Sequence, residues 1–434
     1  MRVVRLSVFL ALTLAAALAG GASPATPHAA VADTASGLAT ASRQSRWKED
    51  LDYFARELSA KHVQFDKIVS PEKFERELRE IERAVPQLSD SEIVLRLMRH
   101  TASLNVAHTR VSWPSGPLQF RQYPVAFYWF SDGLAITAAT PEHREVVGAR
   151  VLRMGGRSPK QVQKAVAAFI PHENSAGLLG EGPVFMRAAE LLQYLKIAEA
   201  DDQLRLQLEQ TNGRRLALQV TPAAEDTLTK WISLWDAFAT PRRFPAKSTA
   251  DYYWFQLLPE TRTLYVQCNN CANAPGNSFA SFARNLFACA DTQAVQRIVV
   301  DLRGNGGGDS TVAEPLLAGL KARPALSAIG NLYVLIGRNT CSSGMWAAVL
   351  LRQRFGARLV GEPTSGKPNS YGDFRIMYLS NSGLEIRYST KWFQLLSSNA
   401  PASLEPDLRA PQSLKDCLAG RDPALEAALR HPLK

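Results

Sequence analysis

From about residue 250 onward, short apolar runs of strand length alternate with stretches that have the apolar spacing of helices. This alternation predicts an α/β core, over residues 250–434, built around a largely parallel sheet. In open α/β sheets, binding sites form at the carboxyl ends of the strands, in the loops that follow them. The predicted strands are 264–266, 298–302, 332–336 and 358–360, and the predicted helices are 279–288, the segment that starts at Ser310, 343–355 and the segment after Asp422.

Two further units precede this core. Residues 44–115 have helical patterning, and Ser89-Asp90-Ser91-Glu92 forms the capping box of one of the expected helices. Residues 118–225 instead indicate a small mixed unit of short strands and one helix. Its expected strands are 123–130, 133–137, 148–154, 204–208 and 216–220, and its expected helix follows Ser158.

The first 43 residues are typical of an exported protein. Arg2 and Arg5 precede an apolar stretch, Leu6 to Ala19, that is short for a membrane span and is followed by small residues. We therefore expect residues 1–22 to be a cleaved signal peptide, with an uncleaved anchor as the alternative, and residues 23–43 to be a flexible leader. No later apolar run is long enough to span a membrane, so the mature protein is expected in the periplasm or outside the cell.

The composition, with 46% hydrophobic and 21% charged residues, excludes a disordered chain and a multi-span membrane protein. The net charge of +10 is spread along the chain, which favours a solvated basic surface over a nucleic-acid site. Cys268 and Cys271 are spaced as C-x-x-C but have no second pair or nearby histidine, so a local disulfide or two spectator thiols is expected there. We expect neither a metal nor an organic cofactor.

Ser342 follows a predicted strand and opens a predicted helix, in the sequence Ile336-Gly337-Arg338-Asn339-Thr340-Cys341-Ser342-Ser343-Gly344. Backbone N–H groups and the helix dipole favour negative charge at such a turn, as an acyl-transfer nucleophile requires. The competing interpretation is a helix-capping serine without chemistry. The G-x-S-x-G motif of α/β-hydrolases is absent.

A glycine-rich turn follows the predicted strand 298–302, in the sequence Asp301-Leu302-Arg303-Gly304-Asn305-Gly306-Gly307-Gly308. Glycines allow close approach of the backbone to a ligand, and their N–H groups can stabilise an oxyanion. Neither the Walker pattern nor G-x-G-x-x-G fits a phosphate cradle here. A simple tight turn is the structural alternative.

These segments resemble motifs of the tail-specific or C-terminal-processing peptidases, the S41 class of serine peptidases. Five motifs occur in the family's order between about residues 45 and 430, which makes the resemblance specific. The motifs are Leu104-Asn105-Val106-Ala107-His108-Thr109, Asp301 to Gly308, Cys341-Ser342-Ser343-Gly344, Gly361-Glu362-Pro363-Thr364-Ser365-Gly366-Lys367 and Glu405-Pro406-Asp407.

The resemblance assigns the nucleophile to Ser342 and leaves two candidates for the general base. Lys367 lies 25 residues after Ser342, as in the Ser–Lys members, whereas His108 matches the base of members that lack this lysine. Pro368, where lysine-using members commonly have glycine, leads us to favour His108. Glu405 is the candidate to orient the base.

The resemblance also implies the rest of the catalytic arrangement and the fold. The oxyanion donors would be N–H groups of Gly306, Gly307 and Ser343. The fold would be α/β, with a ClpP/crotonase-like catalytic core, a helical N-terminal domain and a small PDZ-like insertion. Because Cys341 adjoins Ser342, a Cys–His mechanism remains an alternative. It requires the motif to be aligned one residue earlier, so that the nucleophile position falls on Cys341.

The sequence thus predicts an exported serine peptidase that hydrolyses peptide or protein substrates through an acyl-enzyme on Ser342. The alternative is a catalytically inactive S41-like protein that binds a peptide or an apolar ligand. A complete nucleophile–base pair distinguishes the two, since an inactive relative has no need to keep both groups.

Overall fold

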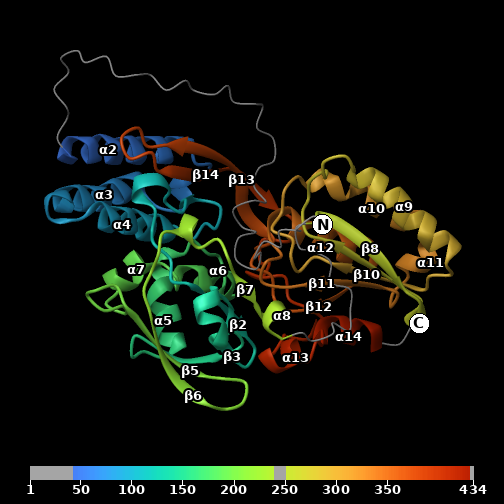
Figure 1. Ribbon diagram of the computed structural model, residues 1–434. Coiled ribbons are helices and arrows are strands. Elements are labelled where there is room, and N and C mark those ends of the chain that lie inside the picture. Colours follow the sequence, from blue (N-terminus) through green and yellow to red (C-terminus); the bar gives the residue numbers. More distant parts are fainter. Residues whose placement is uncertain (1–42, 239–250, 431–434) are drawn as a thin grey trace.

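The computed structural model describes residues 43–238 and 251–430, which form a mixed α/β fold with three sheets (Figure 1). The expected signal peptide and the leader up to residue 42 lie outside the described residues, and Arg43 already belongs to the first described helix. Among the described residues, no helix is both long enough and apolar enough to cross a membrane.

Three helices form the N-terminal part, as their apolar periodicity predicts. Their buried side chains repeat at helical spacing, for example Trp47, Leu51, Phe54 and Leu58 in the first helix. The capping box predicted at Ser89 is present, with the Ser89 hydroxyl and the Glu92 carboxylate each accepting the other's backbone N–H. The helices are α2 (Arg43–Lys61), α3 (Pro71–Ala84) and α4 (Asp90–Ala102).

A six-stranded sheet forms the centre of the C-terminal part, in the order β15-β12-β11-β10-β9-β8. All neighbouring pairs are parallel except β8 with β9, which confirms the predicted parallel-leaning sheet. The turns that contain the candidate site residues follow β10, β11 and β12, so they meet at the carboxyl-terminal edge of the sheet. The strands are β8 (Tyr253–Leu258), β9 (Thr263–Cys268), β10 (Arg297–Asp301), β11 (Leu332–Ile336), β12 (Arg358–Gly361) and β15 (Leu408–Arg409).

Helices cover both faces of this sheet, which explains why its central strands are apolar along their whole length. All five residues of β10 and of β11 are buried. One face packs against α9, α10 and α12, and the other against α14. The helices of this part are α9 (Phe279–Thr292), α10 (Glu314–Lys321), α11 (Pro324–Ser327), α12 (Ser342–Phe355), α13 (Leu414–Leu418) and α14 (Pro423–Arg430).

The unit between the two parts is built on an antiparallel sheet in the order β2-β3-β4-β5-β6, with β7 added beside β3. The strands expected in this unit are present, but two helices that we did not predict, α6 and α7, fill residues 175–194. The elements are β2 (Val125–Phe130), β3 (Gly133–Ala139), β4 (Arg150–Met154), α5 (Pro159–Val166), α6 (Ser175–Phe185), α7 (Ala189–Tyr194), β5 (Leu204–Glu209), β6 (Arg215–Val220), β7 (Ile232–Ser233) and α8 (Leu234–Ala237).

A long hairpin joins the C-terminal part to the N-terminal helices (Figure 1). Its strands are β13 (Asn369–Tyr378) and β14 (Glu385–Gln394), and β14 also pairs with β1 (Arg110–Val111). At the hairpin tip, the Asp50 carboxylate of α2 accepts hydrogen bonds from the backbone N–H groups of Asn381 (2.9 Å) and Ser382 (2.8 Å). The sequence analysis did not foresee this hairpin.

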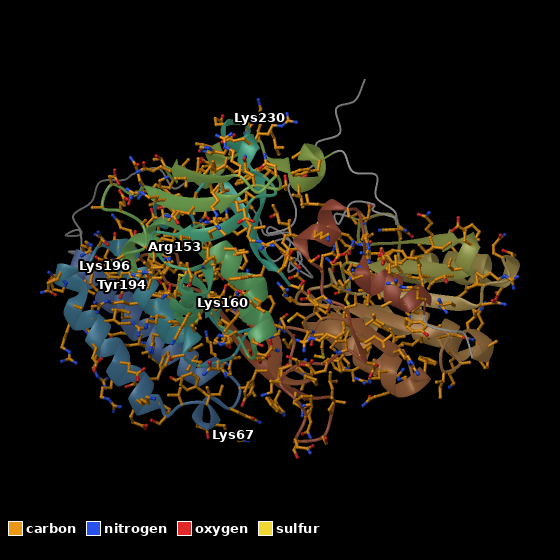
Figure 2. All side chains as sticks on the ribbon, turned by 90° about the horizontal axis from the view of Figure 1, so that it is seen from below. Lys67, Arg153, Lys160, Tyr194, Lys196 and Lys230 are labelled. Carbon is orange, nitrogen blue, oxygen red and sulfur yellow. The ribbon has the colours of Figure 1, made fainter. Side chains whose placement is uncertain are left out.

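Charged side chains cover the outside of the molecule, and the labelled lysines Lys67, Lys160 and Lys230 lie at well-separated places on it (Figure 2). Among the described residues, no group of three or more His, Cys, Asp or Glu side chains is placed to hold a metal ion. All five cysteines are free thiols.

An ion-pair network fixes the chain at the end of β10. The Arg303 guanidinium donates to Asp301 (Nη2–Oδ2 2.5 Å) and to Asp422 at the start of α14 (Nη2–Oδ2 2.7 Å). The Tyr265 hydroxyl donates to the same Asp301 carboxylate at 2.6 Å. Asp301 is 4% exposed, so its charge depends on these partners for compensation.

Replacing Arg303 by methionine should therefore destabilise the fold by about 3 kcal/mol, because two carboxylates would be left facing each other without a cation. Urea unfolding of the variant checks this value. Asp291→Asn, which removes the exposed ion pair with Arg323, is the control and should shift the midpoint little. Equal shifts in the two variants would contradict a special role for the Arg303 network.

Candidate active site

Ser342 is the first residue of α12, directly after the turn that follows β11. Its φ is +48°, in the left-handed region that residues other than glycine rarely occupy. The turn is held by Thr340, whose hydroxyl donates to the Leu302 carbonyl at 2.8 Å and accepts from the Gly337 N–H at 3.0 Å. Backbone strain of this kind is frequent at functional sites, and here it falls on the candidate nucleophile itself.

The glycine-rich turn after β10 lies against Ser342. A Cβ added to Gly307 would be 2.6 Å from the Ser342 Cβ and 3.0 Å from its Oγ, and Gly307 has φ +117°. The Ser343 hydroxyl donates to the Gly308 carbonyl at 2.6 Å, which joins the turn to the first turn of α12. The structure therefore brings together the two segments that the sequence singled out.

Asn305 organises the backbone of this turn. Its Oδ1 accepts the Gly307 N–H at 2.9 Å, its Nδ2 donates to the Cys268 carbonyl at 3.1 Å, and its own carbonyl accepts the Cys341 N–H at 3.0 Å. The Gly307 N–H is therefore already engaged, and this geometry does not support its expected role as an oxyanion donor. Among the described residues, the N–H groups of Gly306, Gly308 and Ser343 donate to no acceptor. The Ser343 nitrogen lies 3.2 Å from the position that a Cβ on Gly307 would take, directly after the nucleophile in the chain.

Substitution within the turn gives a matched pair of variants. Gly307→Ala should lower kcat/KM roughly a hundredfold or more, because the new methyl group collides with Ser342 and displaces the donors around it. Gly306→Ala should stay within a few-fold of wild type, since a Cβ at Gly306 meets nothing within 4 Å. Kinetics and thermal melts of both variants check this prediction. Equal losses in the two would contradict it.

His108 lies in the segment between α4 and β1, which is anchored through its neighbour Thr109. The Thr109 hydroxyl is bonded to His62 (2.9 Å) and to the Ser389 hydroxyl of β14 (3.2 Å). The pKa of His108 is lowered to about 4, mainly by burial and also by the positive charge of Arg110, whereas Glu181 and the backbone of Tyr371 act in the opposite direction. His108 is therefore neutral at physiological pH. Its Nδ1 is buried and has no hydrogen-bond partner.

An Arg110–Glu181 ion pair links the histidine to the nucleophile turn. The guanidinium of Arg110 makes two bonds to the Glu181 carboxylate of α6, at 2.9 and 3.0 Å. This pair acts electrostatically both on His108 and on Cys341, the residue before Ser342. The sequence analysis did not identify Glu181. Glu181 is the seventh residue of α6, an unpredicted and glycine-rich helix, so its position gave no signal.

Lys367 directly follows Gly366, and Gly366 packs against the nucleophile turn. A Cβ added to Gly366 would be 3.2 Å from the Ser342 nitrogen, and the Gly366 N–H donates to the Thr340 carbonyl at 3.2 Å. The Lys367 side chain is half-buried and its charge acts on Glu173, a carboxylate that the sequence analysis also missed. The structure thus places both candidate bases in segments adjoining the nucleophile turn.

Glu405, the candidate to orient the base, is exposed. Among the described residues its carboxylate has no hydrogen bond or ion pair, and it is not among the charges that act on His108. The carboxylate that does act on His108 is Glu181. The difference arises because α6, which the sequence did not predict, enters the site.

Cys341 caps α12 through its backbone, and its thiol is unsuited to nucleophilic attack. The pKa of this thiol is raised to about 11, mainly by burial and also by the negative charge of Glu173. The thiolate is the reactive form, so Cys341 is almost entirely in its unreactive form near neutral pH. This favours Ser342 over Cys341 as the nucleophile.

Comparison with solved structures identifies the fold. No family model matches the chain, and no curated protein matches its sequence. Mature CPAF in complex with lactacystin superposes with a TM-score of 0.59 at 13% identity, over 89% of this chain and 97% of the other. A second structure of mature CPAF gives a TM-score of 0.60 at 12% identity, over 89% and 96%.

The photosystem II D1 C-terminal processing protease is also found, with 14% identity, 89% and 97% of the two chains covered, and a TM-score of 0.40. The CPAF matches extend over nearly the whole of both chains, so they concern the complete arrangement of parts and not a single shared unit. The chain therefore has the fold of the CPAF structures.

Proposed function

We propose that this protein is a serine peptidase of the S41 type that hydrolyses peptide bonds through an acyl-enzyme on Ser342. The observation that carries the proposal is the contact between the strained Ser342 turn and the glycine turn, with backbone N–H groups of the two turns, among them that of Ser343, that donate to no acceptor among the described residues. A nucleophile flanked by fixed backbone donors is what acyl transfer to a serine requires. The likeness to the CPAF structures supports the fold on which the proposal rests.

In the proposed mechanism, His108 takes the proton from the Ser342 hydroxyl as Oγ attacks the scissile carbonyl. A base must offer a free ring nitrogen and must be neutral, and the unpartnered Nδ1 and the low pKa of His108 meet both conditions. The N–H groups of Gly308 and Ser343 would hold the oxyanion. The imidazolium would then protonate the leaving amine, and a water would release the acyl group by the same route.

Several finer points belong to the same proposal. Residues 118–225 would form the PDZ-like insertion and residues 250–434 the ClpP/crotonase-like core. The pattern of the first 22 residues supports export to the periplasm or beyond. The partners would be peptides or unfolded protein segments, since a hydrolase of this class acts on extended chains.

A fluorophosphonate probe tests the proposal directly, because it reacts with activated serine hydroxyls. We expect one adduct per chain, and peptide mapping should locate it on Ser342. An adduct elsewhere, or no adduct together with no hydrolysis of a mixed peptide library, would refute the proposed function. Comparing the termini of exported proteins with and without the enzyme would then identify the natural substrates.

A further inference from the structure

Arg110 closes the short segment that carries His108. Its guanidinium donates to the Ala107 carbonyl through Nε at 3.1 Å and through Nη2 at 2.9 Å, so the side chain holds the main chain directly before the histidine. Directly after the histidine, Thr109 is anchored through its hydroxyl, and the backbone of Arg110 pairs with Arg387 of β14. The backbone of His108 is therefore fixed on both sides.

Glu181 of α6 holds the Arg110 guanidinium in this position. One carboxylate oxygen accepts a hydrogen bond from Nη1 at 2.9 Å and the other accepts one from Nη2 at 3.0 Å, which is the paired geometry that suits a guanidinium and a carboxylate. Both side chains are only 19% exposed, so water competes little for these bonds. The planar fork of the guanidinium fixes a direction as well as a charge, so a residue of α6 determines where the Ala107 carbonyl lies.

Helix α6 is itself attached to the part of the chain that carries the nucleophile. Asn174 caps the helix by accepting the Gly177 N–H at 2.9 Å, and its side-chain nitrogen lies within hydrogen-bond distance of backbone carbonyls of that part. These carbonyls belong to Thr364 (3.1 Å), Ser365 (3.0 Å) and Ala402 (2.7 Å). At Gly180, next to Glu181, a Cβ would lie 3.6 Å from the Arg338 carbonyl oxygen. The Glu181 carboxylate is thus placed relative to the nucleophile turn.

The imidazole of His108 lacks the direct carboxylate partner that a catalytic histidine usually has. In Ser–His–Asp hydrolases, a carboxylate binds a ring nitrogen of the base and orients the ring. Among the described residues, no ion pair joins the His108 ring to a carboxylate, unlike His100, which is paired with Glu77 at 3.1 Å. The place of the ring therefore depends on the main chain that carries it, which Arg110 and Glu181 fix.

We propose that Glu181 is a positioning residue: through Arg110, its carboxylate fixes the segment that carries His108 and so keeps the imidazole within reach of Ser342. The inference rests on the proposed function, in which His108 is the base. Glu181 then takes the task that the sequence suggested for Glu405, but it acts on the main chain and not on the ring. The effect on rate is large because a reacting group displaced by about 1 Å can lose a hundredfold in rate while remaining intact.

Two variants test the proposal, and each alters the pair in a different way. Glu181→Gln keeps the shape of the side chain but replaces one acceptor oxygen by an amide nitrogen that cannot accept from the guanidinium. Arg110→Lys keeps the positive charge but lacks the fork that binds the Ala107 carbonyl and Glu181 together. Glu190→Gln is the matched control, because Glu190 accepts two bonds from Arg121, at 2.8 and 2.9 Å, in the same unit but without a bond to a candidate catalytic segment.

We expect kcat to fall roughly tenfold or more in Glu181→Gln and in Arg110→Lys, with KM within about twofold of wild type, because the base is misplaced while substrate binding is untouched. Glu190→Gln should keep the wild-type values. Thermal melts show which variants are folded, and if one of the two is not, the other decides. A folded variant with wild-type kcat, or with a loss confined to KM, would overturn the positioning role.

A measurement that needs no activity separates this proposal from the proposed function. Diethyl pyrocarbonate modifies neutral imidazoles, and peptide mass spectrometry locates the modified histidines. We expect the rate at His108 to rise about fivefold or more in Glu181→Gln and in Arg110→Lys, because a loosened segment exposes the buried Nδ1, and to stay unchanged in Glu190→Gln. The other histidines of the same samples are the internal reference.

The combined results assign each failure to one proposal. If the wild-type protein is neither labelled by a fluorophosphonate nor active, the peptidase assignment fails, yet the modification rate at His108 still decides whether Glu181 fixes that segment. An unchanged rate in both variants would overturn the inference even in a fully active enzyme. Faster modification beside an unaltered kcat would leave Glu181 as a structural contact only.

Discussion

Replacing Ser342 by alanine should lower peptide hydrolysis by a thousandfold or more and abolish labelling by a fluorophosphonate, because the attacking oxygen is lost. The fold should be unaffected. Alanine keeps the Cβ that packs against Gly307, and the strained φ of this position costs alanine and serine about the same. Steady-state kinetics and a thermal melt of the same preparation check both statements.

Two neighbouring variants control this experiment. Cys341→Ala should retain activity, because its buried thiol carries no charge near neutral pH. Ser343→Ala should lose some activity, since its hydroxyl joins α12 to the Gly308 carbonyl, but it should still be labelled. A silent Cys341→Ala enzyme beside an active Ser342→Ala enzyme would transfer the nucleophile to the thiol.

The second prediction with a large expected effect concerns which residue, His108 or Lys367, is the general base. His108→Ala should lower kcat/KM roughly a hundredfold or more, the usual cost of losing a general base. Lys367→Ala should keep most of the activity, because in the proposed mechanism the lysine side chain takes no part in the proton transfer. The opposite pattern would identify the lysine as the base.

The pH profile provides an independent measure of the same choice. The unperturbed imidazole value of about 6.5 predicts an acid limb near that pH, but burial moves the pKa of His108 to about 4. Since the neutral form is the base, activity should persist well below pH 6 and fall only near pH 4. A limb near 6.5 would mean that His108 is more open to water than in the structure.

The same shift affects stability. The unfolded chain binds a proton at His108 below about pH 6.5, whereas the folded protein binds it only below about pH 4. Between these values the unfolded state is favoured as the pH falls. Burial of one neutral histidine thus makes the region around the site less tolerant of acid, alongside its use as a base.

The central sheet could be predicted from the sequence because its strands are buried on both faces and are separated by regular helices. The strand 332–336 was predicted at its observed bounds, and the observed α12 begins one residue before the predicted helix. The turn after β10 was identified by its run of glycines, and the turn after β11 by its serine between a predicted strand and a predicted helix. Their contact with each other follows from the parallel order of the strands.

Helix α6 could not be predicted, because the glycines that allow it to pack closely at the site also disfavour an isolated helix. Its sequence contains Gly177, Gly180, Gly182 and an internal Pro183, which all disfavour an isolated helix. Tertiary contacts override this preference. Gly182 packs where any side chain would collide with Gln163, and Gly180 brings the helix against the nucleophile turn. The carboxylates of Glu173 and Glu181 were missed with the helix that places them.

The pairing of β1 with β14 has a consequence for how the protein is made. Arg110 pairs with Arg387, and Arg303 binds Asp422, so the segments carrying His108 and the glycine turn are each fixed by residues synthesised much later. Contacts of such long sequence separation form late in folding, because closing the intervening loop costs entropy before the contact repays it. A nascent chain that has not yet delivered Asp422 therefore has its serine but no assembled site. Under the proposed function, such a chain would gain activity only after these late contacts have formed.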